Sequence, residues 1–154
     1  MAVTHEYNAT VSWRGSTGEG YELYSREHTV TAPPAETQLR LSSDPAFRGD
    51  PALLNPEQLL VLAAASCQLL SFLAVAARAR IDVVGYEDIA HAEMPENVKP
   101  MHIMRIKLRP VVTIRAEVAE ERLLHLTEVA HRECYIANSL KTQVLVEPIF
   151  RLVG

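Results

Sequence analysis

Residues 55–60, Asn55-Pro56-Glu57-Gln58-Leu59-Leu60, open the stretch that decides the fold of this chain. Asn55 is a favoured N-cap residue, and Pro56 fits the first position of a helix. Glu57 suits the positive end of the helix dipole, and Gln58 stands at the capping-box position. The apolar residues that follow indicate a long helix, which we expect to run over residues 56–79.

The expected helix is apolar on nearly every side. Residues 59–77 contain no Asp, Glu, Lys or Arg and approach the length of a membrane span. Ser66, Cys67 and Gln68 in its interior, and the lack of a positive cluster at its start, favour a helix buried by protein instead. A small single chain can hardly cover such a helix. We therefore expect a homodimer and no membrane association.

The rest of the chain predicts an α+β fold, with antiparallel sheets packed around the long buried helix in a single domain over residues 1–154. The Pro- and Gly-rich stretch from residue 42 to 54 reads as a loop. Hydrophobic periodicity predicts strands over residues 5–14, 21–31, 37–41, 81–93, 101–116 and 144–150, and a second helix over residues 117–133 with a short extension or turn at 136–140.

Composition narrows the function classes. The net charge of −4 argues against a nucleic-acid partner, because phosphate binding needs clustered Lys and Arg. The first seven residues lack the basic and apolar regions of a secretory signal. We therefore expect a cytoplasmic protein, in which the two cysteines of the chain are reduced at rest.

Cys67 lies in the middle of the expected helix. Its neighbours one turn away carry no charge, so a reactive thiolate there needs a cation from elsewhere in the fold. Glu57 lies ten residues earlier, nearly three turns away, and cannot touch the thiol along the same helix. It favours the helix start or orients an arginine. Without such a cation, Cys67 is a small hydrophobe that packs in the core. Candidate cations are Arg14, Arg26, Arg40 and Arg48.

Cys134 has ionisable neighbours, with His131 one turn before it and Glu133 beside it. His131 could favour the thiolate of Cys134 or share a metal ion with it. Two ligands make a weak metal site, and the other histidines have no ligand spacing. The sequence has no Gly-rich phosphate loop either.

Two motifs together resemble the OsmC/Ohr family. Asn55-Pro56-Glu57-Gln58-Leu59-Leu60 followed by Ala64-Ala65-Ser66-Cys67 is similar to the family's NPEQL…AxxSAC signature, with the same ten-residue step from Glu57 to Cys67. The segment from His131 to Ser139 places Cys134 where the family has its second cysteine. The order of strands and helices also fits along roughly residues 5–150.

The resemblance implies a thiol-dependent peroxidase that reduces organic hydroperoxides, with hydrogen peroxide as a further substrate, in oxidative and osmotic stress defence. Members form intertwined homodimers with active sites at the subunit interface. Cys67 would attack the peroxide and become a sulfenic acid, and Cys134 would condense with it to a disulfide. A dithiol reductant, a lipoyl protein or another thiol, would then reopen that disulfide. Glu57 would orient an arginine that stabilises the thiolate. The resemblance implies that no metal or organic cofactor is needed.

The arginine is the point at which the sequence departs from the two best-known branches of the family. Neither Trp13-Arg14-Gly15 nor Phe47-Arg48-Gly49 reproduces the expected arginine motif, and the chain is more similar to a less characterised OsmC-like branch. Arg26 and Arg48 are both candidates. The alternative function is a non-catalytic OsmC-like protein that binds a small hydrophobic molecule at the dimer interface. A third alternative is that the two cysteines only pack.

Overall fold

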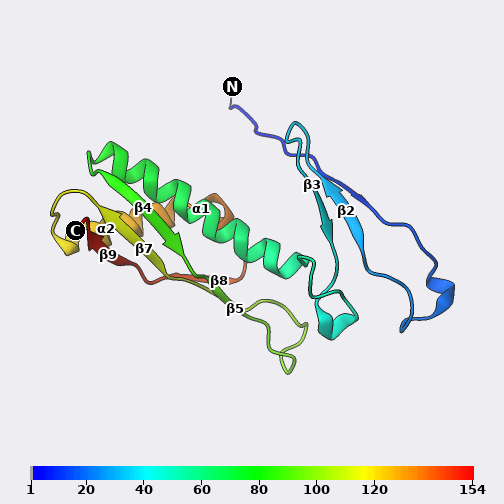
Figure 1. The fold of residues 1–154 in the computed structure, drawn as a ribbon. Helices are drawn as coiled ribbons and strands as arrows, with labels where there is room; N and C mark the ends of the chain where they lie inside the picture. Colours follow the sequence, from blue (N-terminus) through cyan, green and yellow to red (C-terminus); the bar gives the residue numbers. More distant parts are fainter. Residues whose placement is uncertain (1) are drawn as a thin grey trace. The chain divides into compact units, whose positions relative to one another are not determined.

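The computed structural model describes residues 2–154, which divide into two compact units, one ending at Leu59 and the other beginning at Leu60 (Figure 1). We call them unit 1 and unit 2. Unit 1 contains one antiparallel sheet with the strand order β1-β2-β3. Its elements are β1 (Thr10–Ser12), the 3₁₀ turn η1 (Thr17–Glu19), β2 (His28–Thr31), β3 (Gln38–Leu41) and the 3₁₀ turn η2 (Pro45–Phe47).

The loop between β3 and the long helix is held by its own hydrogen bonds. Ser43 Oγ donates to the carbonyl of Phe47 at 3.0 Å, and the Asp44 side chain accepts from the amide of Ala46 at 2.8 Å. The chain turns so tightly that a Cβ atom on Gly49 would lie 1.6 Å from the carbonyl oxygen of Ser43. Glycine is therefore required at residue 49.

The long helix α1 (Pro56–Arg78) begins and ends within one residue of the prediction. Asn55 Oδ1 accepts from the amide of Gln58, and Gln58 Oε1 accepts from the amide of Asn55, both at 2.9 Å. This reciprocal pair is the predicted capping box, which satisfies backbone amides that a helix start otherwise leaves without partners.

Unit 2 contains two three-stranded sheets, with the strand orders β4-β7-β9 and β5-β6-β8. Two helices, α2 and α3, follow β7 and precede β8 along the chain. The elements after α1 are β4 (Val83–Asp88), β5 (His91–Glu93), β6 (Arg105–Leu108), β7 (Pro110–Ile114), α2 (Glu120–Arg132), α3 (Tyr135–Asn138), β8 (Gln143–Val146) and β9 (Ile149–Leu152).

The α+β class is confirmed, but the strand predictions differ in detail. Each predicted strand over residues 81–93, 101–116 and 144–150 is two strands that belong to different sheets. β8 and β9 pair parallel with β6 and β7, where we expected antiparallel sheets only. They return after α2 and α3, and such a crossover is what allows parallel pairing. In unit 1, the strands predicted over residues 5–14 and 21–31 are shorter, at β1 and β2.

Two hydrophobic clusters form the core of unit 2. The first core cluster packs α1 and α2 against β4, β7 and β9, and it includes Phe72, Val112 and Leu123. The second core cluster packs α1 against β6 and β8, and it includes Ala64, Ile106 and Leu108. Helix α1 therefore crosses from the second cluster to the first between Ala64 and Phe72.

One face of α1 is not covered within a single chain. Leu62 and Leu70 are 52% and 64% exposed. We expected α1 to be buried on all sides, and one copy of the chain does not achieve this. Among the described residues, α1 is also the one helix whose length and composition would allow it to cross a membrane, and 28% of its most apolar window is buried. The core helices of soluble proteins meet the same criteria.

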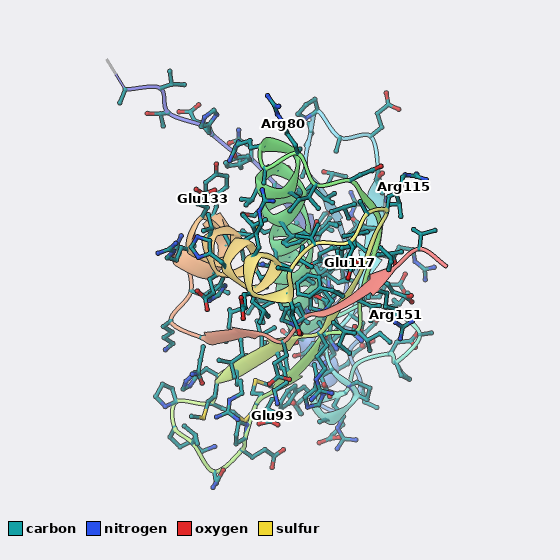
Figure 2. All side chains as sticks on the ribbon, turned by 90° about the vertical axis from the view of Figure 1, so that its left-hand side faces the viewer. Arg80, Glu93, Arg115, Glu117, Glu133 and Arg151 are labelled. Atoms are coloured by element: carbon teal, nitrogen blue, oxygen red, sulfur yellow. The ribbon has the colours of Figure 1, made fainter. Side chains whose placement is uncertain are left out.

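Charged side chains of unit 2 lie at its outside. Figure 2 shows Arg80, Arg115 and Arg151 pointing away from the packed helices and strands, and all three are exposed. Arg115 Nε pairs with Asp82 at 2.7 Å on this surface. Exposed pairs of this kind contribute little to stability, so the two core clusters hold unit 2 together.

Candidate thiol site

The structure brings the two cysteines of the chain together in unit 2. Cys67 lies midway along α1 and is half-buried, whereas Cys134 is 1% exposed. Cys67 is among the groups that raise the pKa of the Cys134 thiol, so the two thiols lie near each other. Both are reduced. Residues 67 positions apart in the sequence therefore lie close together, as a disulfide between them requires.

A hydrogen bond between α1 and α2 positions this pair. Ser71 Oγ donates to the carbonyl of Ala130 at 2.7 Å. Ser71 lies one turn after Cys67 on α1, and Ala130 lies four residues before Cys134. The bond therefore fixes the two helices against each other one turn away from the thiols.

Cys134 lies just beyond the second helix, which we predicted over residues 117–133. Helix α2 ends at Arg132, and Cys134 stands at the N-cap of the short helix α3. Burial raises the pKa of the Cys134 thiol, and its interaction with Cys67 raises that pKa further. The amides of Ala137 and Ile136 lower it in part. Cys134 is consequently a thiol rather than a thiolate at neutral pH, and it must lose a proton before it can attack.

Arg26 lies in unit 1 within a cluster of aromatic rings. Its guanidinium carbon lies 3.7 Å from the ring centroid of Tyr24 and 4.7 Å from that of Tyr21. Its terminal nitrogens donate to the backbone carbonyls of the same two tyrosines. These contacts use two of the five guanidinium N–H donors, so an anion can still bind to the others. Arg26 also borders an apolar pocket of about 380 Å³ together with Val11 and Trp13.

The other predicted site residues of unit 1 are arranged differently. Arg48 forms an exposed ion pair with Glu22. Glu57 lies in the first turn of α1 and is half-exposed, and no arginine of residues 2–154 forms an ion pair with it. Arg26 lines the same pocket as Pro56, the residue before Glu57.

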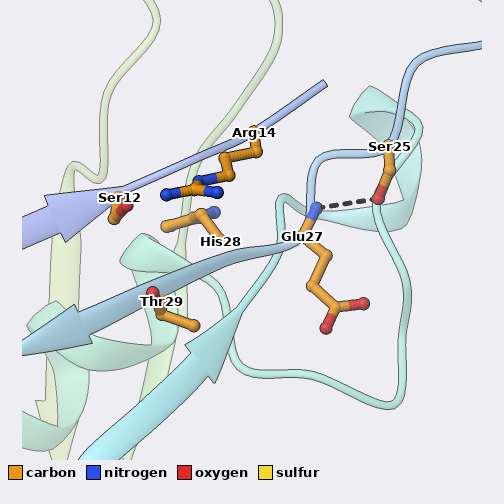
Figure 3. Close-up of a pocket in the computed structure, with 6 residues that line it drawn as sticks. All are labelled: Ser12, Arg14, Ser25, Glu27, His28 and Thr29. Carbon is orange, nitrogen blue, oxygen red and sulfur yellow. Dashed lines mark hydrogen bonds between the residues drawn. The ribbon is translucent and has the colours of Figure 1, made fainter.

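The remaining arginine candidates of unit 1 lie elsewhere. Arg40 Nη2 pairs with Glu27 Oε1 at 2.6 Å. Arg14 lies beside His28 in a separate pocket of about 370 Å³ (Figure 3). In the same pocket, the amide of Glu27 donates to Ser25 Oγ at 3.1 Å. Arg40 is therefore already paired with a carboxylate, whereas Arg14 forms no ion pair among residues 2–154.

Within residues 2–154, no group of three or more His, Cys, Asp or Glu side chains is arranged to hold a metal ion. His131, which the sequence placed one turn before Cys134, is half-buried, and its Nδ1 atom has no hydrogen-bond partner among those residues. A shared metal between His131 and Cys134 thus gains no third ligand.

Three polar side chains with buried, unpaired atoms were not predicted as site residues. Gln68 is 1% exposed, and neither polar atom of its carboxamide has a hydrogen-bond partner among residues 2–154. The Tyr86 hydroxyl and Asp88 Oδ2 are buried without a partner as well. Only Gln68 could have been noticed in the sequence, as a polar residue in the interior of an apolar helix.

Comparisons with known proteins identify the class. The profile of the OsmC-like protein family matches residues 49–148. An OsmC-like protein of unknown function from Vibrio cholerae is 31% identical, with a TM-score of 0.85, and the match covers 95% of this chain and 100% of that one. The chain therefore belongs to the OsmC-like protein family. No curated protein matches it.

More distant solved structures share the fold. An organic hydroperoxide resistance protein from Elizabethkingia anophelis is 17% identical, with a TM-score of 0.69, over 99% of this chain and 100% of that one. A putative organic hydroperoxide resistance protein from Vibrio cholerae, with captopril bound in one of its active sites, is 21% identical, with a TM-score of 0.68, over 97% and 94%. At these identities, the likeness shows the fold.

Proposed function

We propose that this protein is a thiol-dependent peroxidase that reduces organic hydroperoxides through Cys67 and Cys134. The observation that carries the proposal is the proximity of the two thiols, one half-buried on α1 and one buried after α2. Cysteines that only pack in a core have no reason to lie next to each other. Here the two cysteines of the whole chain do so. Membership of the OsmC-like family and the fold shared with hydroperoxide resistance proteins support the same activity.

The reaction has three balanced steps. The Cys67 thiolate attacks one peroxide oxygen, the O–O bond breaks, and the alkoxide takes a proton and leaves as an alcohol. The Cys67 sulfenic acid then condenses with the Cys134 thiol, which forms a disulfide and releases water. Two electrons from a dithiol, such as a lipoyl protein, return both cysteines to thiols. Hydrogen peroxide would follow the same steps and release water in place of the alcohol.

Arg26 is the better candidate for stabilising the Cys67 thiolate. Its guanidinium is held by two carbonyls and two aromatic rings, whereas Arg48 is already paired with Glu22 on the surface. A held cation that no carboxylate neutralises stabilises an anion more than a mobile, paired one does. Glu57 would orient Arg26. The pocket that Arg26 borders is also lined by Pro56, the residue before Glu57.

We further propose that the protein acts as a cytoplasmic homodimer in oxidative stress defence. The uncovered leucines of α1 support a second copy, because a soluble chain gains stability by removing such side chains from water. Those leucines would equally suit the alternative function, a non-catalytic protein that binds a small hydrophobic molecule at the dimer interface. Exposure to excess peroxide separates the two: thiols that stay reduced while an apolar fluorescent probe binds would favour the binder.

Stopped-flow mixing of the reduced protein with cumene hydroperoxide tests the proposal. We expect rapid consumption of one equivalent of peroxide by the wild type. Cys67→Ser should slow peroxide consumption by about a thousandfold or more, since serine is a far weaker nucleophile at neutral pH. Cys134→Ser should retain the first step and accumulate the sulfenic acid. A Cys67→Ser variant as fast as the wild type would refute the assignment.

A further inference from the structure

The two core clusters of unit 2 meet at a polar seam. Along α1, the buried residue between Ala64 of the second cluster and Phe72 of the first is Gln68. Along the segment that begins with β4, Tyr86 packs on the first cluster, Ala90 packs on the second, and Asp88 lies between them. The helix and the strand therefore each place a polar residue at the boundary between the clusters. We call Gln68, Tyr86 and Asp88 the seam residues.

The side chains of the seam residues converge on one region. Tyr86 and Asp88 are two residues apart on β4 and so point to the same face of the sheet. The Tyr86 ring lies 6.0 Å from the ring of Phe72, which is one helical turn from Gln68 on the same face of α1. Both residues of β4 thus face the side of the helix that carries Gln68.

Four atoms at the seam have no hydrogen-bond partner among residues 2–154, namely both polar atoms of the Gln68 carboxamide, the Tyr86 hydroxyl and Asp88 Oδ2. The other carboxylate oxygen of Asp88 accepts from the amide of Arg109 at 2.7 Å, so the side chain is fixed in place. Buried polar groups almost always have partners, and where protein atoms are too far apart, an ordered water molecule bridges them.

The seam is also close to the thiol pair. Tyr86 packs against the cluster that contains Ala130, and Ala130 accepts the hydrogen bond from Ser71 beside the two cysteines. Along the chain, Cys134 also lies between Ala130 of the first cluster and Ile136, which packs on the second. Burial first, and then the charges of Asp88 and Cys134, raise the pKa of Tyr86. Burial also raises the pKa of Asp88, so its carboxylate accepts a proton more readily than an exposed one does.

We propose that the seam residues enclose buried water, and that this water and the Tyr86 hydroxyl carry the Cys134 proton to Asp88 when the disulfide forms. The role of Asp88 rests on the thiol chemistry proposed above. Asp88 does not touch the reacting sulfur atoms and acts on Cys134 only through the water and the Tyr86 hydroxyl. The proton leaves Cys134, its sulfur bonds to that of Cys67, and the S–O bond of the sulfenic acid breaks. The released hydroxide regains a proton from Asp88 through the same route, so the net products are a disulfide and water.

The test separates disulfide formation from the first oxidation of Cys67. Asp88→Asn keeps an oxygen for the Arg109 amide and removes the proton acceptor. Glu87→Gln changes the exposed neighbouring carboxylate of β4 and serves as the matched control. With cumene hydroperoxide, we expect Asp88→Asn to slow disulfide formation about tenfold or more, since an internal proton acceptor supplies at least that factor. The rate of Cys67 oxidation should stay within about twofold, and Glu87→Gln should match the wild type in both steps.

Diamide, which oxidises dithiols without a peroxide, provides a second arm. Closure of the disulfide again requires Cys134 to lose its proton, so Asp88→Asn should close more slowly than Glu87→Gln. The diamide experiment tests the role of Asp88 even if wild-type Cys67 fails to react with peroxide. That failure would refute the proposed peroxidase activity and leave the proton route to be tested with diamide. Tyr86→Phe should slow closure in the same way, and it replaces Asp88→Asn if that variant does not fold.

Two results would overturn the inference. One is disulfide formation at the wild-type rate in the seam variants with both oxidants. The other is a high-resolution crystal structure in which no ordered water binds Gln68, Tyr86 or Asp88. Ordered water bound to these side chains, together with slow closure in Asp88→Asn, would support it.

Discussion

The two units of this protein hold their functional side chains by different means. The thiols of unit 2 are positioned by packing, because α1 and α2 share a core in which Phe72 and Ala130 are nearly inaccessible. Unit 1, among its described residues, has one buried hydrophobic side chain, Leu41. Its arginines are held instead by carbonyls, aromatic rings and ion pairs. The proposed nucleophile thus lies against a core, and its proposed activator lies at a surface.

The largest expected difference between the units is in stability. Phe72→Ala removes a buried ring from the first core cluster and should lower the free energy of unfolding by about 3–5 kcal/mol. Leu41→Ala in unit 1 should cost about 2 kcal/mol, the low end for such truncations, because few buried neighbours surround it. Urea unfolding followed by circular dichroism measures both. Equal losses would contradict the contrast.

The next effect sharpens the role of unit 1 in activity. Arg26→Lys removes the planar guanidinium that stacks on Tyr24 and should lower the rate constant of Cys67 oxidation about a hundredfold. Arg48→Lys keeps a charge that is already paired at the surface and should change it less than about threefold. Stopped-flow kinetics with cumene hydroperoxide compares the two. A larger loss in Arg48→Lys would reverse the assignment.

The smallest expected effect is in the loop that precedes α1. Gly49→Ala places a methyl group against the Ser43 carbonyl and should destabilise the protein by about 1–3 kcal/mol through forced movement of the backbone. Gly154→Ala is the control, because its added methyl group meets nothing within 4 Å. Thermal unfolding of both variants measures the difference. A Gly49→Ala variant as stable as the control would show that the loop is less rigid than its hydrogen bonds indicate.

Much of unit 2 could be predicted from local signals. The capping residues Asn55 and Gln58 marked the start of α1, and the stripe of leucines marked α2, because both signals act within one or two helical turns. The division of long strand patterns at Ala90 and Arg109 was not visible, since a strand keeps the same alternation when it passes from one sheet to another.

The site was predicted in part, for a comparable reason. The two cysteines and Glu57 stand out in the sequence, but the contact between Cys67 and Cys134 depends on how α1 crosses α2. Asp88 could not be singled out, because an acidic residue in a strand is usually exposed and only the tertiary fold buries its Oδ2 atom. Sequence patterns thus indicate candidate reactive groups, and the fold determines which of them lie close together.

The central claim is that Cys67 and Cys134 form a redox pair. The most direct measurement treats the reduced protein with one equivalent of cumene hydroperoxide, blocks remaining thiols with iodoacetamide, and determines the intact mass and the linked peptides. We predict a peptide pair joined through Cys67 and Cys134, loss of both alkylation sites, and full recovery of both with a dithiol. Two alkylated cysteines and unconsumed peroxide would contradict the account.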